Sequence, residues 1–133
     1  MELIILTTTL ALIQYIYFAV SVGNARRQYG IRAPQMTGHA IFERHLRVQE
    51  NTQEQLIIFI PVQFMYGWIG DNLGWYGYET AAALGVVWLI GRGLYARAYV
   101  REPLSRSVGF LMTVGPSMLM LLGCIGGVLV SLL

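Results

Sequence analysis

Lysine is absent from this chain of 133 residues, and charged residues of all kinds make up only 12% of it, against 56% apolar residues. A soluble domain carries about twice that charged fraction, at roughly 25%. The composition therefore favours an integral membrane protein. At about 20 residues per helical span, the length allows four spans and leaves no room for a large catalytic domain outside the membrane.

Cysteine is nearly absent as well, because Cys124 is the single one and lies within an apolar run. This excludes a disulfide framework and a cysteine-rich metal site. A metal site built from His39, Glu43 and His45 is not expected either, because their spacing does not bring both histidines to one face of a helix. The sequence predicts no metal ion as cofactor.

The basic residues are nine arginines, which fall in the two windows 26–47 and 92–106 and leave a formal net charge of +2. Nucleic-acid binding would need basic residues spread over a solvated face together with stacking aromatics, so no nucleic-acid partner is expected. The positive-inside bias instead predicts that both arginine-rich connections lie in the cytoplasm, with both termini on the opposite side.

Hydropathy predicts one all-α domain over 1–133, an integral membrane four-helix bundle with spans at about 3–22, 41–70, 76–101 and 107–132. The first run is too long for a signal-peptide core and lacks a basic start, which favours a retained helix followed by a polar connection over 23–40. The second span would reach roughly 45 Å, beyond a hydrocarbon core of about 30 Å. Its polar part, 43–55, should project on the same side as the arginine-rich end of the third span.

Polar residues recur at helical spacing on both projecting ends, and each group shares one face of its helix. These residues are Glu43, Arg47, Asn51 and Glu54 on the second helix, and Arg92, Tyr95 and Tyr99 on the third. A solvated helix end at the lipid headgroups would explain them. However, an ionisable group near the apolar boundary costs on the order of 2 to 3 kcal/mol unless it is paired or faces a wet cavity.

The chemistry of such a cavity suits a small zwitterionic ligand with net negative charge. Arginine presents a rigid fork that matches carboxylates, and Glu54 can accept an ammonium group. Asn51 offers a donor and an acceptor, and the tyrosines donate hydroxyls beside apolar rings. A tripeptide thiol such as glutathione fits this set. An anionic lipid headgroup would also fit, although the carboxylate of Glu54 would then repel it.

The motif Phe42-Glu43-Arg44-x-x-Arg47-x-Gln49-x-Asn51-x-x-Glu54 resembles the signature of the MAPEG family, the membrane-associated proteins of eicosanoid and glutathione metabolism. The resemblance extends over the whole chain, through the arginine pair after the first span and Arg92-x-x-Tyr95-x-x-x-Tyr99 with Arg106 beyond it. Gln55 departs from the tyrosine that some members carry, and Pro61 lies about one helical turn later than the family's proline.

The resemblance implies a homotrimer in the lipid bilayer, with glutathione bound as co-substrate between adjacent subunits at the cytosolic face. One subunit would supply Arg47, Gln49, Asn51 and Glu54, with Arg26 as a carboxylate contact, and the neighbouring subunit would supply Arg92, Tyr95 and Tyr99. For catalysis, the resemblance points to Arg106 as the residue that stabilises the thiolate, to Ser107 as a second candidate for thiol activation, and to Arg27 as a group that assists the acceptor.

Three functions from different classes follow from these features. The first is a membrane-bound glutathione transferase that conjugates a hydrophobic electrophile in detoxification, with a glutathione peroxidase activity toward lipid hydroperoxides as a further option. The second is a non-catalytic MAPEG-like protein that binds lipid or glutathione, against which the presence of Arg106 and Tyr95 argues. The third, a small exporter, would need an acidic residue deep in a span, and the first helix offers only Gln14.

Overall fold

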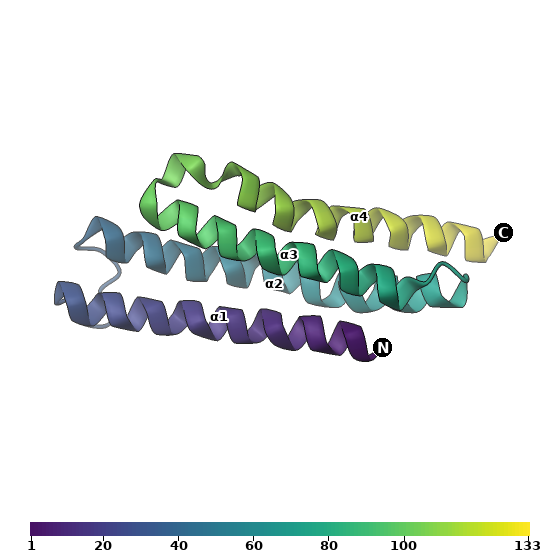
Figure 1. Cartoon of the computed structure of the whole chain (residues 1–133), viewed down its shortest axis with the longest axis horizontal. Helices are drawn as coiled ribbons and strands as arrows, with labels where there is room; N and C mark the ends of the chain where they lie inside the picture. The colour runs from purple at the N-terminus through teal and green to yellow at the C-terminus, as the bar shows by residue number, and fades with distance from the viewer.

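The computed structural model describes all residues from 1 to 133 and contains no strand. Four long helices run alternately up and down, side by side (Figure 1). They are α1 (Glu2–Tyr29), α2 (Ala40–Asn72), α3 (Gly77–Arg101) and α4 (Ser107–Leu132), with a short 3-10 helix, η1 (Pro103–Arg106), before α4. The helices α2 and α3 each pack against every other helix, whereas α1 and α4 lie on the outside. The prediction of an all-α four-helix chain is confirmed.

The first helix is longer than its apolar run. It continues to Tyr29 and ends at Gly30, which adopts the left-handed conformation with φ 66° and whose N–H donates to the carbonyl oxygen of Arg26. The expected polar connection over 23–40 therefore starts seven residues later than predicted, and Arg26 and Arg27 lie in the last turn of α1. A helix ends where its carbonyls are capped, and glycine is the residue best suited to that cap.

The helix α2 is continuous through Pro61 over its 33 residues, so it is roughly 50 Å long. Its second half carries the core side chains. The ring of Phe59 stacks on Trp88 of α3 with centroids 4.4 Å apart, and both side chains are fully buried. Burial of these two large aromatic side chains fixes the register of α2 against α3, and this register positions the polar residues nearer the other end of both helices.

A buried amide ties three helices together. Gln63 of α2 donates to the hydroxyl of Thr7 at 2.8 Å and to the carbonyl oxygen of Ala81 at 3.1 Å, and its own oxygen accepts from Thr8 at 3.0 Å. These partners come from α1 and α3. Interhelical hydrogen bonds of this kind hold membrane helices together where lipid removes the hydrophobic drive for association.

The helix α4 lies directly against the backbone of α3. A Cβ added to Gly109 would overlap the backbone nitrogen and Cα of Tyr95, so only glycine permits this approach. The contact fixes the position of Tyr95 along the helix axis, beside the start of α4.

We expect Gly109→Ala to lower the midpoint of thermal unfolding in detergent, because overpacking a close contact costs about 1 to 3 kcal/mol. Gly126→Ala in the same helix is the matched control, since a Cβ there meets nothing within 4 Å. The control should be neutral or stabilising by about 0.5 to 1 kcal/mol, the usual difference between glycine and alanine in a helix. Equal midpoints for the two variants would contradict the close contact.

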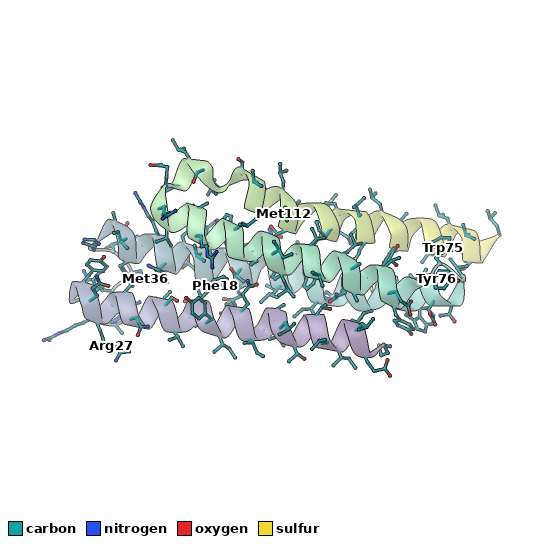
Figure 2. All side chains as sticks on the ribbon, in the orientation of Figure 1. Phe18, Arg27, Met36, Trp75, Tyr76 and Met112 are labelled. Atoms are coloured by element: carbon teal, nitrogen blue, oxygen red, sulfur yellow. The ribbon has the colours of Figure 1, made fainter.

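Two segments are long and apolar enough to cross a membrane by length and composition, α1 and Pro103–Leu132. Side chains project outward along both (Figure 2), and large apolar ones such as Ile16 and Leu122 are 60% exposed. The helices α2 and α3 carry polar residues over part of their length and are not apolar enough to qualify by composition. Four membrane crossings, with the spans placed as above, therefore remain a prediction.

Candidate functional site

The polar residues of α2 contact one another as their spacing predicts. The carboxylate of Glu54 accepts a hydrogen bond from Arg47 at 3.3 Å and another from the amide of Asn51 at 3.0 Å. Arg47 also pairs with Glu50 at 3.6 Å. The side chains of Arg47 and Glu54 are 46% and 54% exposed, so this pair lies on an open face of the chain.

Arg92 of α3 reaches the same group from the neighbouring helix. Its Nη2 donates to the side-chain oxygen of Asn51 at 2.8 Å, and its guanidinium carbon lies 4.1 Å above the centre of the Tyr95 ring. Unlike Arg47, this arginine is fully buried within the chain. The two polar stripes predicted on separate helices therefore meet at the Arg92–Asn51 hydrogen bond.

The guanidinium of Arg92 is incompletely paired. Its Nε and Nη1 atoms are buried and have no hydrogen-bond partner, and no carboxylate lies within 4.0 Å of it. A buried donor without a partner costs about 1 to 3 kcal/mol, and more when it is charged. The structure thus holds a buried cation with two N–H-bearing nitrogen atoms that have no partner within the chain.

Aromatic rings continue the group toward α4. The rings of Tyr95 and Tyr99 stack with centroids 5.5 Å apart, and the guanidinium carbon of Arg106 lies 5.3 Å from the centre of the Tyr99 ring. Tyr95 is 1% exposed, whereas Arg106 is exposed at the start of α4. We call the connected set the Arg92 network. It consists of Arg47, Asn51, Glu54, Arg92, Tyr95, Tyr99 and Arg106.

Two residues predicted to bind the ligand lie outside the Arg92 network. Arg26 donates to the carbonyl oxygen of Gln35 and lies 4.7 Å above the ring of Phe42, so within this chain it joins the end of α1 to the start of α2. Gln49 points toward α1, where its amide donates to the hydroxyl of Tyr15 at 3.4 Å. Neither residue contacts the Arg92 network within one chain.

The remaining two catalytic candidates make no contact with it either. Arg27 projects away from the end of α1 (Figure 2) and bonds only Asn24, one helical turn earlier, at 2.8 Å. Ser107 is the first residue of α4 and is exposed, without a side-chain hydrogen bond. Ser107 directly follows Arg106 in the sequence, but its side chain makes no hydrogen bond to any residue of the Arg92 network.

Comparison with known proteins relates this arrangement to a family. The profile of the MAPEG family matches residues 4–126, almost the whole chain. The chain belongs to the MAPEG family. Membership in it, together with the two apolar segments, indicates an integral membrane protein.

Relatives of this MAPEG chain come from bacteria and animals. An uncharacterized protein of Synechocystis sp. is 40% identical over 124 residues, which cover 93% of this chain and 86% of the relative. Human microsomal glutathione S-transferase 2 is 38% identical over 85% of this chain and 74% of its own length. Bovine leukotriene C4 synthase is 34% identical over 74% of this chain and 62% of its own length.

Within one MAPEG chain, Arg92 bonds Asn51, although the resemblance assigns these two residues to adjacent subunits. The division of the ligand contacts between two subunits stays a prediction. Residues 51 and 92 face each other because α2 and α3 pack along their length. One chain therefore brings together seven of the predicted site residues, and only Arg26, Arg27, Gln49 and Ser107 stay apart from them.

Sequence reasoning missed the role of Arg44 in this MAPEG chain. Its Nη1 donates to the carbonyl oxygens of Val100 at 3.0 Å and Arg101 at 2.9 Å, where α3 ends. A cation at the last carbonyls of a helix satisfies acceptors that have no partner within the helix. The contact joins residues 56 and 57 positions apart, so only its residue type could have suggested it. The Arg44 contact joins the start of α2 to the end of α3, which are the polar ends of these two helices.

Proposed function

We propose that this chain is a membrane-bound glutathione transferase that binds glutathione at the Arg92 network and transfers its thiolate to a hydrophobic electrophile. The observation that carries the proposal is the buried guanidinium of Arg92, with two nitrogen atoms unpaired and no carboxylate beside it. Support for the substrate class comes from relatives named microsomal glutathione S-transferase 2 in three mammals, at 32% to 38% identity.

Glutathione offers a partner to each part of the Arg92 network. A carboxylate would supply an acceptor for the unpaired N–H groups of Arg92, since arginine forms strong charge-assisted hydrogen bonds to carboxylates. The ammonium group fits Glu54, whose carboxylate lies on the open face beside Asn51. The sulfur would then lie toward the tyrosine pair and Arg106, where a guanidinium can stabilise the negative charge of a thiolate.

The reaction follows from this placement. The thiol gives up its proton to solvent, and the thiolate attacks the electrophilic carbon of the acceptor. A carbon–sulfur bond forms while the bond to the leaving group breaks, and the leaving group departs with the electron pair. With a lipid hydroperoxide as acceptor, two glutathione molecules would be oxidised to the disulfide while the hydroperoxide is reduced to an alcohol and water.

A second copy of the chain would complete the site. The Arg47–Glu54 pair lies on an open face, and a neighbouring subunit that covered it would exclude water from the bound thiolate. Arg26 and Gln49, which do not reach the Arg92 network in their own chain, would be available to such a neighbour. We propose a homotrimer in which these contacts form, with the site at the cytosolic face and both termini on the opposite side.

The proposal is tested with the full chain in detergent by calorimetry with glutathione and by the ultraviolet absorbance of the bound thiolate. We expect saturable binding, a thiolate signal at neutral pH, and conjugation of a generic aryl halide. S-methyl glutathione is the control ligand, since it should bind without a thiolate signal. Binding without thiolate or conjugation would favour the non-catalytic alternative, and the absence of both binding and thiolate would overturn the proposal.

A further inference from the structure

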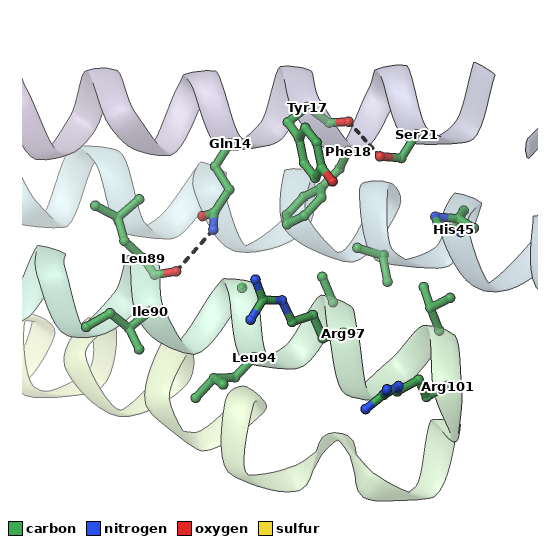
Figure 3. Close-up of a pocket in the computed structure, with 14 residues that line it drawn as sticks. Gln14, Tyr17, Phe18, Ser21, His45, Leu89, Ile90, Leu94, Arg97 and Arg101 are labelled. Carbon is green, nitrogen blue, oxygen red and sulfur yellow. Dashed lines mark hydrogen bonds between the residues drawn. The ribbon is translucent and has the colours of Figure 1, made fainter. Parts of the chain in front are cut away.

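A cavity lies between α3 and α1, on the side of α3 away from α4. Its volume is about 860 Å³, within the usual range of roughly 300 to 1,000 Å³ for ligand sites. Figure 3 shows side chains of α1 and α3 lining it, with His45 of α2 near one end. The amide of Gln14 donates to the carbonyl oxygen of Leu89 at 3.1 Å and bridges the two helices at the opposite end.

The two ends of this cavity differ in chemistry. Leu89, Ile90 and Leu94 line the part near Gln14, and eight of the fourteen lining residues are apolar. Arg101 lies toward the other end with His45, the side chain of Arg97 extends between Arg101 and the Gln14 end (Figure 3), and no lining residue is acidic. Neither arginine side chain makes a hydrogen bond or an ion pair. The cavity is thus a largely apolar groove whose wall carries two guanidinium groups without a partner.

The groove is separate from the Arg92 network. Positions 92, 95 and 99 share one face of α3, whereas positions 90, 94, 97 and 101 lie roughly half a turn away, at about 100° per residue. The network faces α2 and α4, whereas the groove faces α1, and the buried cluster that contains Phe18 and Tyr95 lies between them. A ligand in the groove would therefore not occupy the proposed glutathione site.

We propose that this groove binds one anionic membrane phospholipid, with an acyl chain along the apolar part and the headgroup phosphate at Arg97 and Arg101. From Leu89 to Arg101 the helix rises by roughly 18 Å, which separates a hydrocarbon end from a charged end. Arg101 is the last residue of α3, so the charged end lies where the helix leaves its apolar part. Arginine matches phosphate oxygens geometrically as well as in charge.

Charge complementarity selects this occupant over others. A zwitterionic lipid would leave the two guanidinium groups of the groove without a net countercharge, and an apolar helix of a partner would leave them unpaired. A free phosphate ion would use the arginines but would leave the apolar groove unfilled. Only an amphiphile with net negative charge uses both ends of the cavity.

The test is native mass spectrometry of the detergent-solubilised full chain with phosphatidylglycerol and with phosphatidylcholine of the same acyl chains. We expect preferential binding of phosphatidylglycerol, weakened about five-fold by Arg97→Gln or Arg101→Gln and about 25-fold by both together, the usual contribution of a basic residue at an anionic surface. Arg32→Gln, an exposed residue of the α1–α2 loop outside the cavity, is the matched control for charge and should change nothing.

A second variant tests the groove rather than the charge. A Cβ on Gly93 has room, 3.6 Å from the Gln14 amide nitrogen, so Gly93→Leu fills the groove while both arginines remain. We expect it to reduce phosphatidylglycerol binding at least five-fold, and millimolar inorganic phosphate not to displace the lipid. The proposal would be overturned if the two lipids bound equally well or if Arg32→Gln weakened binding as much as Arg101→Gln. It would also be overturned if Gly93→Leu left binding unchanged or if phosphate displaced the lipid. Glutathione binding does not enter any of these measurements.

Discussion

Replacing Arg92 with glutamine is expected to weaken glutathione binding by about two orders of magnitude and to leave the ligand-free protein as stable as the wild type or more so. Two charge-assisted hydrogen bonds to a carboxylate contribute about 3 kcal/mol in total, so the dissociation constant should rise about 150-fold. The unpaired nitrogens Nε and Nη1 explain the effect on stability, because removing an uncompensated buried charge relieves its desolvation cost.

The two effects separate a ligand-binding arginine from a structural one. An arginine that only held α2 to α3 through Asn51 would lower the midpoint of thermal unfolding when replaced. We therefore expect the midpoint without glutathione to stay the same or rise, and the increase on adding glutathione to disappear. Arg92→Lys keeps the charge without the fork and should recover only part of the affinity. A lower midpoint together with unchanged affinity would show that Arg92 is structural.

Arg32→Gln is the matched control for the loss of one positive charge. Arg32 is exposed in the loop between α1 and α2 and makes no side-chain hydrogen bond or ion pair, so its glutathione affinity and unfolding midpoint should equal those of the wild type. A similar loss of affinity in this variant would indicate that net charge, rather than the site at Arg92, governs binding.

The helices were predictable because their patterns are local. Apolar run length and the polar residues at each end place α2, α3 and α4 within one or two residues of their observed bounds. The first helix was the exception, since its apolar run stops near Val22 while the helix continues to a glycine cap eight residues later. Hydropathy marks where a helix is apolar, and capping marks where it ends. In α2 and α3 the polar residues at helical spacing extended the predicted helices beyond their apolar parts, whereas the last turns of α1 were assigned to a connection.

Contacts within one helix could be predicted at the site, but contacts between helices could not. The spacing of Arg47, Asn51 and Glu54 predicted a shared face, and their side chains do contact one another. Glu43 fits the same spacing, yet it accepts from the backbone of Gly38 because the start of the helix offers it a free N–H.

The bond between Arg92 and Asn51 depends on the register of α2 against α3. Stacking of Phe59 on Trp88 fixes that register, and nothing in the sequence around either residue predicts that these two rings pair. The contact between Gly109 and Tyr95 depends in the same way on how α4 packs. The residues of the site could thus be named from spacing and resemblance, whereas their assembly within one chain required the packing of the core.

Replacing Arg106 with alanine is expected to leave glutathione bound but no longer ionised at neutral pH. Arg106 reaches the Arg92 network only through the ring of Tyr99, so it lies beyond the residues proposed to hold the carboxylate and the ammonium group. Lowering a thiol pKa by two units requires about 2.7 kcal/mol of preferential stabilisation of the anion. Loss of the guanidinium should therefore raise the pKa of the bound thiol by about two units, from below neutral to about 8.5, and reduce the thiolate and conjugation about 25-fold at pH 7.

The pH dependence decides whether Arg106 acts on the thiolate or on binding. A thiol whose pKa has risen is protonated at neutral pH and ionises at higher pH, so the thiolate absorbance of the variant should recover as pH increases. Conjugation should recover over the same range, while the dissociation constant for S-methyl glutathione stays within about three-fold, since that ligand has no thiol proton to lose.

Ser107→Ala is the comparison that separates the two candidates for thiol activation. The Ser107 hydroxyl is exposed and makes no hydrogen bond within the chain, so its removal should shift the thiol pKa by much less than the arginine variant does. If Ser107→Ala instead abolishes the thiolate signal while Arg106→Ala retains it, the serine activates the thiol. In that case the hydroxyl must acquire a contact that a second subunit supplies, and the guanidinium above Tyr99 would serve to orient the ring.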